Sequence, residues 1–228
     1  MKLCLHRQLM RLKKDLFIKK LEQLIFCKEI TTKQSHSIKK KVLNIFERTL
    51  SSDHPKQSTP YDSIGTVYVK IGKYSDALWY CEKALEIDQK ASSPKHHNFG
   101  HFYNNIGIIY RNLGNYSEAL LNFEKAFEID RKVLHSNHPN FALLHLNIGT
   151  VCRNLGEYPK ALSYHEDSLK IRQNSLPPTH FNFAISYAEL GNLYFNMNTY
   201  TKALSFYKKE LEIDEKNITF KSSSFTNA

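Results

Sequence analysis

Histidine is the side chain in this sequence best suited to bind a metal ion or move a proton, and eleven are present. A spacing of 42 residues separates four of them in turn: His54, His96, His138 and His180. Equal spacing puts them at equivalent points of successive units, so we expect loop or helix-start residues and not one metal site. His97 and His101 stand four apart and could share a helix face, but no carboxylate or thiol beside them completes a zinc site.

Other residue patterns that carry enzymatic chemistry are missing from the sequence. It has no glycine-rich phosphate loop, no HExxH helix and no nucleophile elbow. Its cysteines form no CxxC pair, which favours reduced thiols over a disulfide framework or a zinc site. The four are Cys4, Cys27, Cys81 and Cys152. We therefore expect no catalytic residue, no metal and no cofactor.

Asparagine and arginine supply a recurrent polar pattern instead. Asn105 and Arg111 return 42 residues later as Asn147 and Arg153. Asparagine is a poor residue for a helix interior, because its side chain competes for backbone hydrogen bonds. An amide also offers two donors and an acceptor, which is what an extended peptide backbone requires of a receptor. The recurrence therefore suggests peptide binding.

The elements that would position these residues are repeats. RNLGNYSEAL at 111–120 returns as RNLGEYPKAL at 153–162, and this offset of 42 residues holds through four copies. The positions in register include Gly65, Gly107, Gly149 and Gly191, and also Tyr74, Tyr116, Tyr158 and Tyr200. Four repeats are predicted at 58–99, 100–141, 142–183 and 184–217.

Each repeat contains two helical patterns. In the first, Tyr61, Ile64, Gly65 and Tyr68 recur at spacings of three and four, which places them on one helix face. A glycine inside a helix costs roughly 1 kcal/mol, so the glycines at this register predict close approach of a neighbouring helix. Left-handed residues should end the first helices, and the candidates are Gly72, Gly114, Gly156 and Asn198. The second helices should begin near Ser75, Ser117, Pro159 and Thr201.

This pattern resembles the tetratricopeptide repeat family, over residues 58–217. The family motifs W-x2-L-G-x2-Y and A-x3-F are matched by Tyr103-x2-Ile106-Gly107-x2-Tyr110 and Ala119-x3-Phe123. The usual period is 34, and the longer period here, with phrases such as NNIG and FEKAFEID, is similar to kinesin light chain repeats. The resemblance implies an all-α fold, a right-handed α-solenoid of antiparallel helix pairs. It also implies a non-enzymatic protein-protein interaction scaffold or adaptor.

In the resembling family the first helices line a concave groove that binds peptides. The resemblance implies that the amides hold peptide backbone, that the basic groups favour acidic peptides, and that the apolar residues form pockets. The predicted peptide-binding residues are Lys70, Asn104, Asn105, Ile108, Arg111, Asn112, Leu146, Asn147, Arg153, Asn154, Asn192 and Phe195. Two alternatives stay open: the asparagines reflect descent from one repeat unit, and the arginines are solvent-exposed or form salt bridges between repeats.

The net charge of +10 is concentrated in the first quarter of the chain. Residues 1–57 hold 14 Lys and Arg against 5 acids, and residues 58–228 hold 18 against 17. We expect a basic helical leader containing a degenerate repeat, with its second helix at about 37–51. The leader could bind nucleic acid or an anionic membrane surface, or it could be a solvated cap helix. The balanced repeats are not expected to bind nucleic acid.

The last eleven residues, 218–228, are rich in serine and threonine, and we expect a disordered polar tail. Repeat arrays usually need a polar cap, so Leu204, Tyr207 and Leu211 would face a partner, a second copy of the chain or further sequence. Self-association through this end is therefore a hypothesis. Charges interrupt every apolar run, which excludes a secretory signal and a transmembrane segment. The first 14 residues are basic and lack acids, so a mitochondrial presequence stays open as an alternative to the cytoplasm, which the reduced cysteines favour.

Overall fold

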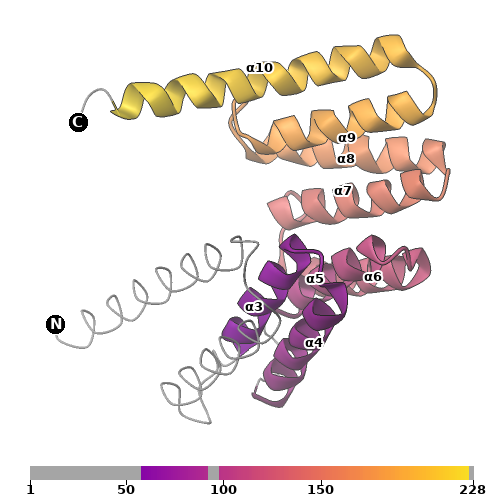
Figure 1. The fold of residues 1–228 in the computed structure, drawn as a ribbon, viewed down its shortest axis with the longest axis vertical. Helices are drawn as coiled ribbons and strands as arrows, with labels where there is room; N and C mark the ends of the chain where they lie inside the picture. The colour runs from indigo at the N-terminus through magenta and orange to yellow at the C-terminus, as the bar shows by residue number, and fades with distance from the viewer. Residues whose placement is uncertain (1–57, 92–97, 226–228) are drawn as a thin grey trace. The chain divides into compact units, whose positions relative to one another are not determined.

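The computed structural model describes residues 58–91 and 98–225, and side chains only as far as residue 217. The predicted leader, its degenerate repeat and residues 226–228 lie outside the described residues. Within these limits every regular element is an α-helix (Figure 1). The chain divides into two compact units, residues 1–96 and 97–228. Each unit is described by itself.

The described part of the first unit is a helix pair, α3 (Ser58–Lys70) and α4 (Tyr74–Ala91). The pair is closed at one end by Ser58 Oγ, which donates to Asp88 Oδ1 at 3.0 Å. Across the pair, the rings of Tyr68 and Tyr80 stack with centroids 5.4 Å apart. Both contacts join α3 to α4, which are the two helices that the sequence predicts for the first repeat.

The second unit contains three further helix pairs, which Figure 1 shows as successive layers from α5 to α10. We call α5, α7 and α9 the first helices and α6, α8 and α10 the second helices. The pairs are α5 (Asn98–Asn112) with α6 (Tyr116–Val133), α7 (Pro139–Asn154) with α8 (Tyr158–Ser175), and α9 (Asn182–Asn196) with α10 (Tyr200–Phe225).

The first helices end where the sequence predicts, because a left-handed residue follows each of them. Gly114 and Gly156 both have φ of +79°, and Asn198 has φ of +57°. At Gly114 the following backbone N–H, that of Asn115, donates back to Tyr110 O at 2.9 Å, which satisfies a carbonyl at the helix end. The predicted helix ends are therefore confirmed.

The four glycines in register, which lie inside α3, α5, α7 and α9, each make room for a side chain of the helix paired with their own. A Cβ on Gly107 would lie 2.6 Å from the Phe123 ring, and one on Gly65 would lie 2.6 Å from Cys81 Sγ. The same closeness holds between Gly149 and His165, and between Gly191 and Tyr207. The predicted close approach of a neighbouring helix is confirmed, with the partner always 16 residues later.

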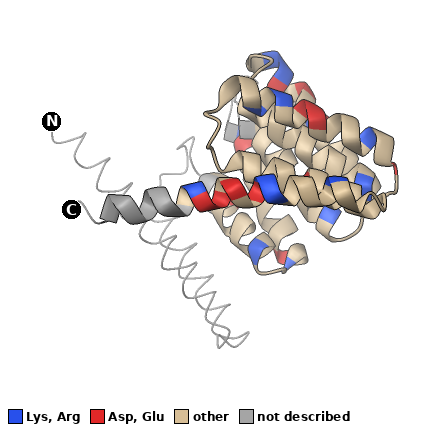
Figure 2. Cartoon of the chain, turned by 90° about the horizontal axis from the view of Figure 1, so that it is seen from above, with Lys and Arg blue, Asp and Glu red and all other residues tan. Residues whose placement is uncertain are grey.

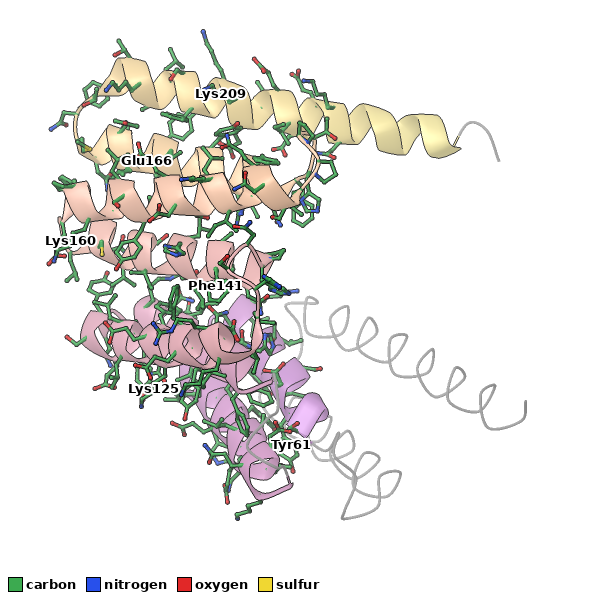
Figure 3. The ribbon with its side chains drawn as sticks, turned by 180° about the vertical axis from the view of Figure 1, so that it is seen from behind. Tyr61, Lys125, Phe141, Lys160, Glu166 and Lys209 are labelled. Atoms are coloured by element: carbon green, nitrogen blue, oxygen red, sulfur yellow. The ribbon has the colours of Figure 1, made fainter. Side chains whose placement is uncertain are left out.

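The core of the second unit runs through successive repeats. Phe123 of α6 is fully buried, and the Phe127 ring of the same helix lies 5.1 Å from the ring of Phe141 on α7. Phe141 is labelled in Figure 3. The buried cluster draws on α6, α7, α8 and α9: Ala119, Phe123, Ala126, Leu144, Ile148, Val151, Cys152, Ala161 and Leu193. Helices α6 and α8 therefore each pack on their own first helix and on the first helix of the next repeat.

The last helix is longer than the sequence predicts. The expected end lay near Asn217, with a disordered tail from residue 218, whereas α10 continues to Phe225. No glycine or proline follows Asn217 to stop a helix. The Asn217 side chain does not cap the helix either, because its Nδ2 donates back to Ile213 O at 2.8 Å. Serine and threonine content alone is a weak stop signal.

Candidate functional site

The first helices of the second unit carry most of the residues predicted to bind peptide. Helix α7 contacts both α5 and α9, so the three helices form one continuous surface. We call it the first-helix face. Its exposed and half-buried residues are His101, Asn105, Ile108, Arg111, Asn112, Leu143, Arg153, Asn154, Ile185, Glu189, Asn192, Phe195 and Asn196. Lys70, also predicted, is exposed on α3 in the first unit, outside this face.

A polar contact joins α5 to α7 beneath this face. Arg111 Nη1 donates to Asn147 Oδ1 at 3.1 Å, and Asn147 Nδ2 donates to Asn104 Oδ1 at 2.9 Å. Asn104 and Asn147 are only 6% and 4% exposed. Both the oxygen and the nitrogen of the Asn147 amide are thus used in hydrogen bonds to α5. This side chain, which the sequence predicted to contact a ligand, joins two adjacent repeats.

The equivalent contact joins α7 to α9, with a carboxylate in place of the amide. Arg153 Nη2 donates to Glu189 Oε2 at 3.3 Å. Thr150 Oγ1 lies 3.2 Å from the same oxygen and shares its one proton with Leu146 O, 2.9 Å away. Arg153 stands 42 residues after Arg111, and Glu189 stands 42 residues after Asn147. The inter-repeat salt bridge that the sequence left open is present at Arg153.

Three exposed apolar side chains and three exposed asparagines remain on the first-helix face. Leu143 and Ile185 are both 41% exposed, and Phe195 is 53% exposed. The exposed asparagines end the three first helices: Asn112, Asn154 and Asn196. Large exposed apolar side chains favour contact with another molecule when they are grouped. The amides offer the donors and acceptors that a peptide backbone needs.

The other predicted site residues divide by burial. Leu146 is 7% exposed and contributes to the interior instead of a surface pocket. Asn105 is half-buried and hydrogen-bonds His101, with Asn105 Nδ2 3.1 Å from His101 Nε2. Asn192 accepts from Tyr207 Oη at 2.8 Å, while Ile108 is half-buried. The side chains of Asn105, Ile108 and Asn192 therefore reach the surface in part. Among all the predicted peptide-binding residues, the exposed ones are Lys70, Asn112, Asn154 and Phe195.

The recurrent histidines that the structure describes begin helices. His138 Nδ1 accepts from the backbone N–H of Asn140 at 3.2 Å, and His180 Nδ1 accepts from Asn182 at the same distance. The predicted helix-start role is confirmed at these two positions, and His54 and His96 lie outside the described residues. In the part of the chain that the structure describes, no three His, Cys, Asp or Glu side chains gather as metal ligands would.

Two further histidines belong to the interior of the third repeat. His165 is 1% exposed, and within the described residues neither ring nitrogen has a hydrogen-bond partner. Burial, aided by the nearby Arg153 charge, lowers the pKa of His165 to about 4. Burial also lowers the pKa of His145, although Asp167 opposes this shift. Both rings are therefore neutral packing groups at neutral pH.

A buried arginine that the sequence analysis did not single out joins α8 to α9. Arg172 is 3% exposed, and its Nη1 donates to Ser186 Oγ at 2.7 Å and to the backbone oxygen of Asn182. Burial lowers the pKa of Arg172 to about 10. One repeat earlier, Asp130 Oδ2 accepts from Asn140 Nδ2 at 3.2 Å. The sequence does mark this residue as unusual, because Arg172 stands at the position where the other three repeats have aspartate.

Comparison with known families gives two matching profiles, both described as tetratricopeptide repeat. One matches residues 76–132 and 140–216, and the other matches residues 59–90. No curated protein sequence matches the chain significantly. No described helix combines the length and hydropathy needed to cross a membrane.

Several solved structures are similar to this chain. BtubC (BKLC) from P. vanneervenii is 20% identical with a TM-score of 0.67, over 87% of this chain and 79% of that one. A Podosopora anserina protein, described as a kinesin light chain with nearly identical TPR-like repeats, is 19% identical with a TM-score of 0.57, over 93% and 94%. MamA is 18% identical with a TM-score of 0.50, over 83% and 98%. At such low identities these likenesses show the fold alone.

Proposed function

We propose that this chain, which belongs to the tetratricopeptide repeat family, is a non-enzymatic scaffold that binds short peptide segments on its first-helix face. Its fold is the all-α solenoid of that family, as predicted. Proteins of this family and fold are typically interaction scaffolds, because stacked repeats present an extended surface. The period of 42 residues supports a kinesin light chain-like repeat type, and the proposal includes no link to a motor.

One observation carries the proposal: exposed apolar groups and exposed amides share the first-helix face. Leu143, Ile185 and Phe195 offer apolar contacts. The asparagines at the ends of α5, α7 and α9 offer hydrogen bonds to a peptide backbone. Because Asn104 and Asn147 satisfy each other beneath this surface, the repeats are held in place before a ligand arrives. A prepared surface lowers the entropic cost of binding.

Acidic groups on the peptide are part of the proposal. Arg111 and Arg153 place two guanidinium groups near the first-helix face, and both are half-buried. Hydrogen bonds from a charged donor to a carboxylate are stronger than those between neutral groups. The Arg111 side chain therefore supports some preference for acidic segments at the end of α5, whereas Arg153 at the end of α7 is paired with Glu189.

A second candidate function is self-association through α10. Leu204 and Leu211 are 56% and 58% exposed, whereas their equivalents on α6, Leu120 and Phe127, are partly buried against the core. On α6 the Phe127 ring packs against Phe141 and His145 of α7, the first helix of the next repeat. The exposed pair on α10 thus supports docking of another helix, and we propose that a second copy of the chain supplies it. Basic and acidic residues are interspersed along this helix (Figure 2).

The alternative function, binding of nucleic acid or anionic membrane, rests on the leader. Residues 1–57 hold 14 of the 32 Lys and Arg and lie outside the described residues. Such binding should weaken steeply with ionic strength, because it releases condensed counterions. We also propose a cytoplasmic location, which the free thiols of Cys81 and Cys152 support.

Peptide selection tests the leading proposal. A displayed library of random peptides is selected on the full chain, on Ile185→Ser/Phe195→Ser and on the control Leu121→Ser/Val133→Ser. The control removes comparably exposed apolar groups from α6, a second helix. We expect the wild type and the control to enrich one shared motif and the face variant to lose it. Equal enrichment on all three, or none on any, would refute the proposal.

A further inference from the structure

The carboxylate of Glu189 breaks the pattern of neutral amides on the first-helix face. Its equivalents one and two repeats earlier are Asn147 and Asn105. A carboxylate only accepts hydrogen bonds, whereas an amide both donates and accepts. Glu189 is therefore unsuited to hold both groups of a peptide backbone, and its role must differ from the one that the sequence assigns to this register.

Glu189 is instead held by Arg153 of α7, whose Nη2 donates to its Oε2 at 3.3 Å. Thr150 Oγ1 lies 3.2 Å from the same oxygen, but its single proton is shared with Leu146 O, which is closer at 2.9 Å. The side chains of Arg153 and Glu189 are 17% and 23% exposed, so solvent screens their attraction less than on an open surface. An acidic group approaching Arg153 would meet a cation that is already paired and a like charge beside it.

The hydrogen-bonding capacity of Arg153 is not exhausted by this pair. Its guanidinium has five N–H donors, and its Nε is buried without a hydrogen-bond partner among the described residues. A guanidinium prefers a bidentate carboxylate. Once the charge of Glu189 is removed, a peptide carboxylate beside Arg153 would no longer meet a like charge.

One exposed apolar side chain on α9 lies beside this ion pair, and a second stands further along the same helix. Ile185 precedes Glu189 by four residues and therefore lies one helical turn away on the same side of the helix. Ile185 and Phe195 are 41% and 53% exposed. The surface of the third and fourth repeats thus combines a neutralised ion pair with exposed apolar side chains.

We propose that Glu189 determines the specificity of the first-helix face by occupying the position on Arg153 that an acidic peptide side chain would take. The third and fourth repeats then select segments whose side chains facing Arg153 are uncharged and whose neighbours are apolar. This inference rests on the proposed function, because it names the ligand chemistry of the same face. The comparable arginine contact one repeat earlier uses the neutral acceptor Asn147.

A charge scan of a selected peptide tests the inference on the full chain. The strongest binder from a displayed random library is synthesised with Asp or Asn, in turn, at each position. For each position, the dissociation constants of the Asp peptide and the Asn peptide are measured with the wild type, Glu189→Gln and Arg153→Gln/Glu189→Gln. Glu189→Gln keeps the shape and the acceptor of the side chain and removes its charge. Glu166→Gln, at an exposed residue of α8 (Figure 3), controls for the change in net charge.

We expect one peptide position at which the wild type and Glu166→Gln bind Asn at least about threefold more tightly than Asp. Glu189→Gln should reverse that ratio at this position, and the double variant should bind both peptides alike. Binding with the same ratios in the wild type and Glu189→Gln would overturn this inference and leave peptide binding intact. Failure of the full chain to enrich any peptide would overturn both.

Discussion

Arg172 Nη1 donates to Ser186 Oγ at 2.7 Å and thereby joins the second helix of the third repeat to the first helix of the fourth. In the preceding repeat the same two positions hold Asp130 and Leu144. Leu144 is buried at 2% exposure, so the smaller Ser186 both leaves space for the arginine and accepts its hydrogen bond. The residues at this junction are therefore matched to each other.

Replacing Arg172 should weaken that junction. Arg172→Met leaves Ser186 Oγ without its donor in the interior, and an unsatisfied buried polar group costs about 2 kcal/mol. Chemical denaturation should show that loss in Arg172→Met and a partial recovery in Arg172→Met/Ser186→Leu, which restores an apolar pair. The exposed substitution Lys170→Met serves as the control. Equal stability of the single and double variants would contradict the matched pair.

The packing of Gly65 on Cys81 predicts that Gly65→Ala lowers stability in the wild type but raises it when Cys81 is replaced by alanine. Gly65→Ala should destabilise the wild type, because a Cβ would lie 2.6 Å from the fully buried Cys81 Sγ and overpacking costs about 1–3 kcal/mol. In a Cys81→Ala background the clash disappears, and the better helix propensity of alanine should stabilise the chain by about 1 kcal/mol. Thermal and chemical denaturation of the four proteins measures both effects. A loss of the same size in both backgrounds would show that the sulfur is not the obstacle.

His165 predicts a loss of stability in mild acid. Its pKa is about 4 in the folded chain, below the ordinary value of 6.5, so the unfolded chain binds more protons between these values. Stability is therefore complete above about pH 6.5 and falls as the pH drops towards 4. The loss attributable to His165 is about 2 kcal/mol at about pH 5.

His165→Phe, which copies Phe123 of the preceding repeat, isolates this effect. Between about pH 7.5 and pH 5 the variant should lose about 2 kcal/mol less unfolding free energy than the wild type. The contribution of His145, whose pKa is also lowered, remains in both proteins. Parallel pH profiles would mean that His165 takes up a proton without cost in the folded chain.

Self-association through α10 predicts a response to charge on its exposed face. Leu204→Glu and Leu211→Glu place carboxylates where the proposed second copy would dock, and burial of unpaired charge disfavours association. Sedimentation equilibrium should show dimers of the wild type and monomers of either variant. Leu121→Glu on α6 tests whether added charge alone has this effect. A monomeric wild type at high concentration would rule out the dimer.

Local conformation accounts for what the sequence predicted well. Gly114 and Asn198 end helices because of their own backbone preferences, and Gly107 marks a close helix contact because nothing else favours glycine inside a helix. The burial of Asn147 and Leu146 was not predictable in this way. Helical spacing places them near the first-helix face, but their burial depends on how α7 is rotated against α5 and α9, which the repeat register does not specify.

Photocrosslinking tests the central claim, peptide binding on the first-helix face, most directly. A selected peptide carrying a photoreactive residue is bound to the full chain, irradiated, and its attachment sites are mapped by mass spectrometry. We predict attachment on α5, α7 and α9, concentrated near Ile185 and Phe195, and abolished by excess unlabelled peptide. Competed attachment confined to residues 1–57 or to α6, α8 and α10 would contradict the claim.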